Sequence, residues 1–479
     1  MKDALPGDVQ SSFIDGARVA PGEARMPWRQ AGGGGVLAIA EADEGVVAQA
    51  VASARRAYEA QRPSPLVARL RHLQSLRDAL SGEAATLASI ISDDVGKPIR
   101  VARGEVARGL QFVEACMAEL AHIGGEVIPL DAVSAGVGRV GYTRRFPYGV
   151  VAAITPFNAP VNLLVQKLAP ALAAGNACVA KPAPASLRTA LHLAGAAVEA
   201  GLPPGMVNVL AGDKAAALAL AAHPDVGAVS FTGGVQAGEA LARATGVRRF
   251  LSELGSSAAN VVLADADLEA AAAKIAAAAF EASGQQCISA QRVIVEAGVY
   301  DAFAARFAAA AERMRVGPAG DERTDIGPLV SEASADRIMA LCEDAIANGA
   351  RYRLAPRREG LILSPVIVEE LKPCARLWYE EVFGPVAVLI RADDAAHALA
   401  LANDSPFGLQ GAVFTRSLGH AFRFAESFEV GALWVNEASR FRLDMYPFGG
   451  MKLSGTGREG VRYAIEELSQ LKFTGIAWQ

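Results

Sequence analysis

Apolar residues follow two different spacings in the first third of the chain. Between residues 66 and 80, leucines recur every three or four positions, which predicts an amphipathic helix with one buried stripe. Residues 125–147 change to an alternation of apolar and polar positions, which predicts an extended ribbon with a turn near residues 134–136. Such a ribbon has little core of its own, so it needs another surface to pair with.

Short apolar runs alternate with helical patterns between residues 149 and 254. Strands are expected at 149–155, 177–180, 207–210, 226–231 and 248–254, with helices between them. Strands separated by helices form right-handed βαβ units and a parallel sheet, and ligands bind beyond the carboxyl ends of its strands. Asn158, Lys181, Gly233 and Glu253 all fall at predicted strand ends, so one crevice could hold them together.

The pattern after Gly255 predicts a second α/β unit. An Ala-rich helix is expected over residues 268–282, and strands are expected near 361–368, 386–390, 411–414 and 432–436. The tail, residues 471–478, is predicted to be a last strand and a candidate partner for the ribbon at 125–147. The expected fold class is therefore α/β throughout.

Length and charge narrow the classes of protein that fit. The 479 residues are too many for a single core, so two or three units are expected. A net charge of −5, with both signs interspersed, favours neither nucleic acid nor a membrane as partner. No apolar stretch is long enough to span a membrane, and Met1 to Gly7 do not resemble a signal peptide.

The five cysteines are scattered and form no CxxC pair, so neither a metal site nor a disulfide framework is expected. This usage suits a reducing compartment, and we predict a cytoplasmic protein. Cys287 follows a Gly-Gln-Gln turn, which predicts a bend that exposes the sulfur. A lone cysteine is more often a small buried hydrophobe, and a catalytic interpretation therefore needs partners for the thiol.

Two further motifs bear on the chemistry. Residues 231–238 (FTGGVQAG) follow a predicted strand and open a helix, as a dinucleotide phosphate site requires, although a tight structural turn explains them almost as well. The six histidines lie outside all of these motifs, so the sequence gives no support to a Cys–His dyad.

Seven stretches occur in an order that is typical of one family. They are 155–158 (TPFN), 181–183 (KPA), 231–234 (FTGG), 253–255 (ELG), 284–287 (GQQC), 381–385 (EVFGP) and 447–450 (PFGG). With these stretches the chain resembles the aldehyde dehydrogenase superfamily over essentially its whole length. The spacing of 34 positions between Glu253 and Cys287 (287 − 253 = 34) is also similar to that family's.

The resemblance implies a fold, a reaction and an assembly. It implies a Rossmann-like dinucleotide-binding domain (1–124 and 148–254), an α/β catalytic domain (255–455), and a small β oligomerisation arm with the C-terminal tail (125–147 and 456–479). The implied reaction oxidises an aldehyde to a carboxylic acid with NAD or NADP. The implied assembly is a homodimer or a homotetramer.

The resemblance also assigns roles to site residues. Cys287 would be the nucleophile that forms a thiohemiacetal and then a thioester. Asn158 would donate to the oxyanion, together with the backbone N–H of Cys287, and Glu253 would be the general base for hydrolysis. The residues implied for the cofactor are Thr155, Pro156, Phe157, Lys181, Gly233, Gly234, Gly238, Leu254, Glu381 and Phe383.

Three positions depart from the usual pattern of the family. Ser256 stands where a second glycine is common, and Gly234 stands where serine is usual. Pro184 replaces a glutamate that NAD-preferring members often carry three residues after the lysine. Without that carboxylate nothing at this position repels a 2′-phosphate, so the sequence does not exclude NADP as the cofactor.

The loop before residues 447–450 suggests the kind of substrate. It resembles the loop of the lactaldehyde, succinate-semialdehyde and phosphonoacetaldehyde dehydrogenase branches and contains Arg442. Because arginine binds carboxylate or phosphonate with two N–H groups, we expect a small anionic aldehyde held by Arg442 and Arg108. The alternatives are a surface ion pair between Arg442 and Asp444, and a solvated Arg108.

Two other functions remain open at this stage. A CoA-acylating relative would transfer the acyl group to CoA instead of water. A non-catalytic scaffold would keep the fold and bind only the dinucleotide, although the presence of Cys287, Glu253 and Asn158 together argues against it.

Overall fold

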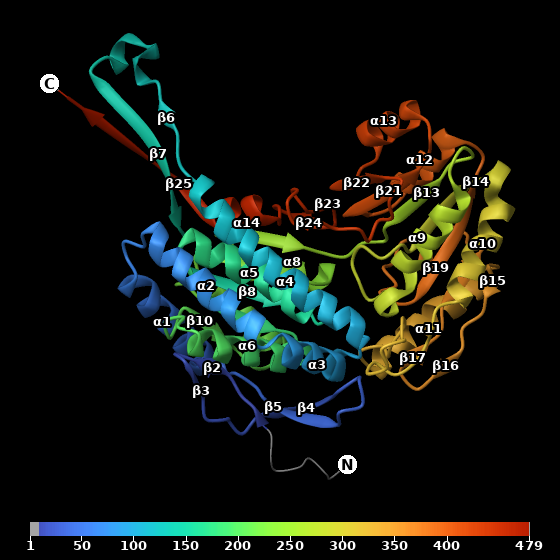
Figure 1. The fold of residues 1–479 in the computed structure, drawn as a ribbon, viewed down its shortest axis with the longest axis horizontal. Coiled ribbons are helices and arrows are strands. Elements are labelled where there is room, and N and C mark those ends of the chain that lie inside the picture. Colours follow the sequence, from blue (N-terminus) through green and yellow to red (C-terminus); the bar gives the residue numbers. More distant parts are fainter. Residues whose placement is uncertain (1–8, 479) are drawn as a thin grey trace.

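The computed structural model describes residues 9–478, which form two α/β units and a projecting arm (Figure 1). The first unit is built on an eight-stranded sheet whose five central strands are parallel, in the order β12-β11-β8-β9-β10. All five strands predicted between residues 149 and 254 are present. They are β8 (Val150–Thr155), β9 (Ala177–Pro182), β10 (Val207–Val209), β11 (Ala228–Thr232) and β12 (Arg249–Glu253).

The order of these strands creates a site for ligands. β8 is the first of the five along the chain, and its two neighbours are the second, β9, and the fourth, β11. The chain therefore leaves β8 and β11 in opposite directions, and a crevice opens beyond their carboxyl ends. Asn158 lies just after β8, and Gly233 lies just after β11.

Helices cover both faces of this sheet. Of the leucine stripe predicted over residues 66–80, Leu73, Leu76 and Leu80 are buried on α2, whereas Leu66 is exposed. Gly96 caps α3 with a φ of 72°. Every residue of α5 is buried, because this helix lies between the sheet and the helices α2, α4 and α14. The helices are α1 (Glu44–Ala60), α2 (Leu66–Gly82), α3 (Ala84–Val95), α4 (Ile99–Glu119), α5 (Pro160–Ala174), α6 (Leu187–Glu199), α7 (Lys214–Ala222), α8 (Val235–Thr245) and α14 (Val461–Glu467).

The edges of the first sheet use short antiparallel strands. β2 (Phe13–Ile14) and β3 (Ala17–Arg18) extend one edge, and β24 (Gly455–Thr456) pairs with β12 at the other. β24 and α14 therefore pack with the first unit, although the predicted boundaries place residues 456–479 with the arm and tail. A small separate sheet contains β1 (Val9–Gln10), β5 (Val36–Ala40) and β4 (Arg25–Arg29).

The second unit has a seven-stranded sheet in the order β15-β18-β19-β14-β13-β21-β22, parallel except for β15. Its strands are β13 (Ala259–Val262), β14 (Arg292–Glu296), β15 (Arg351–Leu354), β18 (Val366–Glu369), β19 (Val386–Ala392), β21 (Gln410–Phe414) and β22 (Ala432–Val435). Its helices are α9 (Leu268–Phe280), α10 (Tyr300–Glu312), α11 (Glu332–Ala347), α12 (Ala395–Asn403) and α13 (Leu418–Ser427).

The arm is a three-stranded antiparallel sheet that stands away from both units (Figure 1). β25 (Ser469–Ala477) pairs along its whole length with β7 (Arg139–Pro147), and β6 (Val127–Ile128) pairs with β7 on the other side. The predicted pairing of the tail with the ribbon is confirmed. Within residues 9–478, no helix combines the length and the apolar character that crossing a membrane requires.

Candidate active site

Cys287 lies in a turn that follows an irregular end of α9. The helix stops at Phe280, two residues before its predicted end, because Ala282 and Ser283 both adopt a positive φ. Ser289 then donates its hydroxyl to the carbonyl groups of Ala278 and Ala279, each at 3.1 Å, which ties the turn back to the helix. The thiol is half-buried in the wall of a cavity, as the predicted bend requires.

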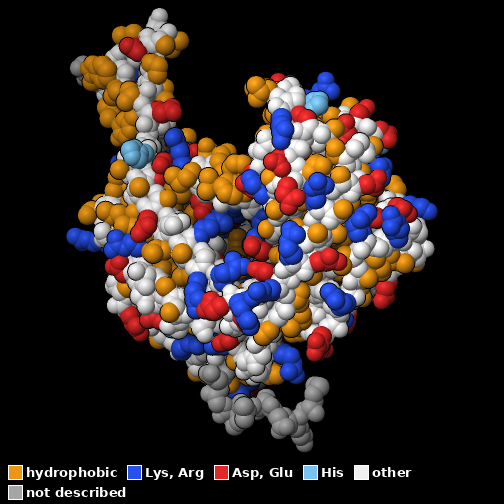
Figure 2. All heavy atoms as spheres, turned by 45° about the vertical axis from the view of Figure 1, so that its right-hand side comes forward, with side chains coloured by type: hydrophobic (Ala, Val, Ile, Leu, Met, Phe, Trp, Pro, Cys, Tyr) orange, Lys and Arg blue, Asp and Glu red, His pale blue; other side chains and the backbone are white. Residues whose placement is uncertain are grey.

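This cavity has a volume of about 560 Å³ and contains two of the three predicted catalytic residues. Cys287 and Asn158 both line it, together with Arg108 and Arg442. Neither the Asn158 amide nor the backbone N–H of Cys287 has a hydrogen-bond partner in the described part of the chain, so both donors are free for a ligand. The surface around the two units carries interspersed basic and acidic side chains (Figure 2).

Glu253 lies beside this cavity and not in its wall. It is the last residue of β12, it is buried, and it lines a smaller pocket that shares Gln166 with the large cavity. One of its carboxyl oxygens, Oε2, has no hydrogen-bond partner within residues 9–478. The negative charge of an ionised Glu253 raises the pKa of the Cys287 thiol.

Burial is the main influence on the protonation of both predicted catalytic groups. Burial and, to a smaller extent, the negative charge of Glu381 raise the pKa of Cys287 to about 12, and Arg442 opposes the shift. Burial also raises the pKa of Glu253 well above its usual value, and the negative charge of Glu459 adds to this, against Arg442 and Lys167. The thiol is therefore protonated at neutral pH and needs an added positive charge to become a thiolate.

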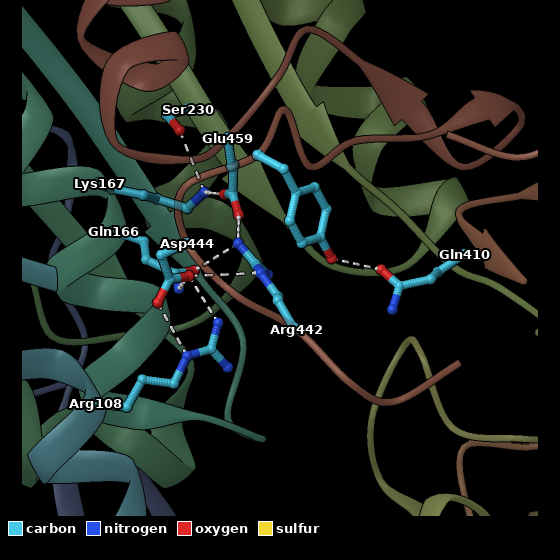
Figure 3. A network of polar contacts seen from close by, with 9 residues as sticks. Arg108, Gln166, Lys167, Ser230, Gln410, Arg442, Asp444 and Glu459 are labelled. Atoms are coloured by element: carbon cyan, nitrogen blue, oxygen red, sulfur yellow. Dashed lines mark hydrogen bonds and ion pairs between the residues drawn. The ribbon is translucent and has the colours of Figure 1, made fainter. Parts of the chain in front are cut away.

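The sequence did not identify Lys167 and Glu459, which share this environment. The Lys167 ammonium donates to Glu459 Oε1 at 3.1 Å and to the Ser230 hydroxyl at 3.2 Å (Figure 3). Lys167 and Arg442 together hold the pKa of Glu459 below its usual value, although burial alone would raise it. Lys167 is the single charged residue of segment 160–174, which was the available signal for it, and nothing comparable marks Glu459.

The structure corrects both simple alternatives for the two arginines. Arg442 is buried: it donates to Glu459 Oε2 at 3.0 Å and to Gln166 at 3.2 Å, and its guanidinium lies 3.6 Å from the ring centroid of Phe448. Arg442 Nε lies 3.7 Å from Asp444 Oδ1, and neither of these side chains is on the surface. Arg108 is not simply solvated, because it donates from two nitrogens to the two carboxyl oxygens of Asp444, at 3.0 and 2.7 Å.

The residues predicted for the cofactor lie at the carboxyl ends of the first sheet. Thr155 ends β8, Pro156 and Phe157 follow it, and Lys181 is the penultimate residue of β9. Burial lowers the pKa of Lys181 to about 8, and Asp213 opposes the shift. A buried ammonium at this edge is a ready partner for hydroxyl or phosphate oxygens.

The glycines after β11 have different surroundings. Gly234 caps α8, and a Cβ there would meet no atom within 4 Å, so free space lies in front of the N-terminus of α8. A Cβ at Gly238 would come within 2.6 Å of the Leu254 side chain, so this glycine lets α8 pack closely. Glycine instead of serine at position 234 therefore leaves open space in front of α8, whereas glycine at position 238 lets α8 pack closely against Leu254.

Glu381 and Phe383 approach this crevice from the second unit. Glu381 accepts a hydrogen bond from the backbone N–H of Ser256 at 2.9 Å, so Ser256 makes this contact through its main chain and not through its hydroxyl. Burial raises the pKa of Glu381 to about 7, partly offset by that hydrogen bond. Phe383 meets Phe157 edge to face, with ring centroids 5.8 Å apart.

These groups fit a nicotinamide dinucleotide. A carboxylate and an ammonium suit ribose hydroxyls, and a helix N-terminus with open space suits a pyrophosphate. The Thr232 hydroxyl is buried without a hydrogen-bond partner among the described residues, which marks a polar atom in need of a ligand. Arg188, which follows β9 on α6, pairs with Asp94 at 2.9 Å.

Comparison with known proteins agrees with this geometry. The model of the aldehyde dehydrogenase family matches residues 28–474. The 3-sulfolactaldehyde dehydrogenase of Priestia aryabhattai is 40% identical over 435 residues, which cover 91% of this chain and 90% of that protein.

Two solved structures share the fold. NADP-dependent glyceraldehyde-3-phosphate dehydrogenase from Bacillus halodurans C-125, complexed with NADP, superposes with a TM-score of 0.95 at 32% identity, over 98% of this chain and 100% of the other. An NAD-dependent aldehyde dehydrogenase from Sinorhizobium meliloti gives 0.93 at 32% identity, over 98% and 95%. The chain therefore belongs to the aldehyde dehydrogenase family and is an enzyme that oxidises an aldehyde with NAD or NADP.

Proposed function

We propose that this enzyme oxidises a small anionic aldehyde to its carboxylic acid and that Cys287, Asn158 and Glu253 carry the reaction. The observation that supports the substrate class is the charge of the cavity shared by Cys287 and Asn158. Six basic residues line it, against three acidic ones. The basic residues are Lys97, Arg100, Arg108, Lys274, Arg440 and Arg442, and the acidic residues are Glu105, Glu281 and Glu437.

Arg108 is the residue best placed to bind the anionic group. Its Nε and Nη2 are held by Asp444, which fixes the plane of the guanidinium, while Nη1 has no partner within residues 9–478. Its side chain is 31% exposed, whereas that of Arg442 is 6% exposed and is engaged by Glu459. In this proposal Arg108 contacts the anionic group directly, and Arg442 adds a positive charge close to that group.

The names of two relatives point to the same kind of substrate. Sulfolactaldehyde and glyceraldehyde 3-phosphate each carry a strongly acidic group a few bonds from the aldehyde. The planar guanidinium of an arginine donates two N–H groups to two oxygens of a sulfonate or a phosphate, whereas the ammonium of a lysine has no such fixed pair of donors.

The reaction begins at the Cys287 sulfur, which attacks the aldehyde carbon as a thiolate. The oxygen becomes an oxyanion, and the Asn158 amide and the Cys287 backbone N–H donate to it. One such donor lowers the barrier by about 3 kcal/mol. When bound, the oxidised nicotinamide supplies a positive charge near the thiol and accepts the hydride, which leaves a thioester on Cys287.

Glu253 then takes a proton from the water that attacks the thioester. The acid is released and the thiol is restored, so that aldehyde, water and NAD(P)⁺ give carboxylate, NAD(P)H and two protons. Because the pKa of Glu253 is raised, its carboxylate is a stronger base than an exposed glutamate, although only the ionised fraction can act.

A panel of aldehydes of matched length tests this proposal. The protein is assayed with NAD and with NADP, and anionic aldehydes are expected to have a KM well below that of neutral ones. Arg108→Gln is expected to raise the KM for anionic aldehydes at least tenfold and to change the KM for neutral aldehydes less than twofold. Arg103→Gln, on the same helix but in an exposed pair with Glu322, is the matched control.

Equal effects of Arg108→Gln on both classes of aldehyde would contradict the anionic substrate. Cys287→Ala is expected to abolish turnover while cofactor binding persists. Turnover that requires added CoA would instead identify a CoA-acylating enzyme.

We also propose that the arm joins subunits into a homodimer or a homotetramer. Several large apolar side chains on it are exposed, as the hydrophobic surface of the arm in Figure 2 illustrates. A cytoplasmic location fits the five free cysteines, of which Cys287 must stay reduced to react.

A further inference from the structure

We propose that the buried pair Lys97–Glu105 positions Asn158 and thereby sets the geometry of the oxyanion site. This inference rests on the proposed role of Asn158. Neither residue belongs to the predicted site, yet both line the cavity that contains Asn158 and Cys287.

The two residues are buried at a break between helices. Lys97 lies in the Gly96–Lys97–Pro98 break between α3 and α4, and Glu105 lies on the second turn of α4. Their side chains are only 6% and 4% exposed. Burying charges this deeply costs free energy unless each charge is fully paired, so we expect further hydrogen-bond partners of Lys97 and Glu105 nearby.

The contacts of the pair converge on one short segment of backbone. The Lys97 ammonium contacts Glu105 Oε2 and donates to the backbone carbonyl oxygen of Asn158 at 2.6 Å. Glu105 Oε1 accepts the backbone N–H groups of Val161 at 2.8 Å and Asn162 at 3.3 Å. The cation therefore holds the carbonyl of Asn158, and the carboxylate holds the first N–H groups of α5.

Glu105 supplies a cap that the local sequence does not provide. The capping residue of α5, Ala159, has no side chain that could accept a hydrogen bond. A carboxylate from another helix takes this role and also complements the positive end of the α5 dipole. The segment from Asn158 to Asn162 is thus fixed at both ends by one ion pair.

Asn158 depends on this fixation because its own side chain is not restrained. Its amide makes no hydrogen bond to any residue in 9–478, so its direction follows from its backbone. A donor that is misplaced by about 1 Å can cost on the order of a hundredfold in rate. Lys97 is accordingly a positioning residue that acts through Asn158.

The test compares Lys97→Met, Asn158→Ala and the double variant Lys97→Met/Asn158→Ala. We expect Asn158→Ala to lower kcat about 100- to 1000-fold. Lys97→Met is expected to lower kcat tenfold to a hundredfold with little change in KM. In the Asn158→Ala background, Lys97→Met should lower kcat less than twofold, because its target has been removed.

Controls separate positioning from loss of stability. Arg103→Met removes an exposed cation from α4, the helix that carries Glu105, and should leave kcat unchanged. If Lys97→Met folds poorly, Lys97→Met/Glu105→Gln buries no unpaired charge and keeps an oxygen for the Val161 N–H. We expect that variant to regain its Tm while kcat stays low.

The outcomes distinguish this inference from the proposed function. If Asn158→Ala keeps the kcat of the wild type, the proposed role of Asn158 is wrong. If Asn158→Ala loses activity but Lys97→Met lowers kcat by the same factor in both backgrounds, only the positioning role is wrong. Recovery of kcat together with Tm in Lys97→Met/Glu105→Gln would also overturn it.

Discussion

At the scale of single residues, the pKa of Glu253 sets the pH range in which this residue could act as the proposed general base. Burial and the charge of Glu459 raise this pKa, and the cations Arg442 and Lys167 oppose the rise. An acid with a raised pKa is protonated over a wider range, so the fraction that can act as a base grows as the pH increases. Hydrolysis should therefore have an ascending limb well above the pKa of an exposed glutamate.

Glu459→Gln is expected to move this ascending limb to lower pH. The substitution removes the negative charge that raises the pKa of Glu253 and leaves Lys167 and Arg442 free to lower it further. The pH profile of kcat for hydrolysis of an activated ester measures the shift, and Glu466→Gln on the exposed face of α14 is the control. An unchanged limb would show that Glu253 is not the titrating base.

At the scale of elements, the turn between α9 and Cys287 depends on left-handed backbone. Ala282, Ser283 and Gly284 all have a positive φ, and Gly284 also lies against the backbone of Gly384. A side chain at Gly284 would come closer to the Gly384 carbonyl than van der Waals contact allows. Only glycine avoids both the steric strain and the overlap.

Gly284→Ala is expected to lower the free energy of unfolding by about 2 kcal/mol or more, since a left-handed non-glycine residue costs about 1–2 kcal/mol before any overlap is counted. The turn should also shift, which changes the rate at which iodoacetamide alkylates Cys287. Thermal unfolding and the alkylation rate measure the two effects. Gly298→Ala, where a Cβ meets no atom within 4 Å, should change neither.

At the scale of the whole molecule, the arm is the feature that a single subunit does not explain. β25 pairs with β7 over nine residues, and the resulting sheet projects away from both units. Val137 and Leu471 are 66% and 61% exposed on it. Exposed apolar side chains grouped on a projecting element mark a contact surface between proteins.

Val137→Asp/Leu471→Asp is expected to dissociate the proposed oligomer into subunits of 49.7 kDa. Charges placed at the centre of an apolar contact cannot be buried without pairing, so association becomes unfavourable. Size-exclusion chromatography with light scattering measures the mass. Val247→Asp, at a fully exposed position outside the arm, should leave the mass unchanged, and a monomeric wild type would contradict the proposed assembly.

Much of the fold could be predicted from local patterns. The five parallel strands of the first sheet, the break at Gly96 and the pairing of the tail with the ribbon all follow from hydrophobic spacing and turn residues. The end of α9 was placed two residues too late, because Ala282 is a good helix former. Tertiary contacts force it into the left-handed region, which propensity cannot show.

The candidate site was predicted less completely. Asn158 and Glu253 were expected in one crevice and, from the resemblance, beside Cys287. The structure brings Cys287 and Asn158 into one cavity, whereas Glu253 lines an adjoining pocket. Arg442 was expected to bind the substrate or to form a surface pair. It lines the cavity, but its side chain is buried against Glu459 and Phe448, so the surface pair is wrong. Lys167 and Glu459 were missed because their pair joins residues 292 positions apart. Lys97 and Glu105 were missed because their contacts with Asn158 and Val161 span 61 and 56 positions.

The sequence by itself determined which residue types stand at the ends of which strands, and therefore the α/β class, and its resemblance to a family indicated the thiol, amide and carboxyl groups of the proposed reaction. The strands and their ends depend on neighbours in the chain, through periodicity and turn chemistry. Only the tertiary structure decided which charges pair, how deeply they are buried and so which groups are protonated. Those properties depend on distances between segments that lie hundreds of residues apart, such as the 336 positions between Arg108 and Asp444.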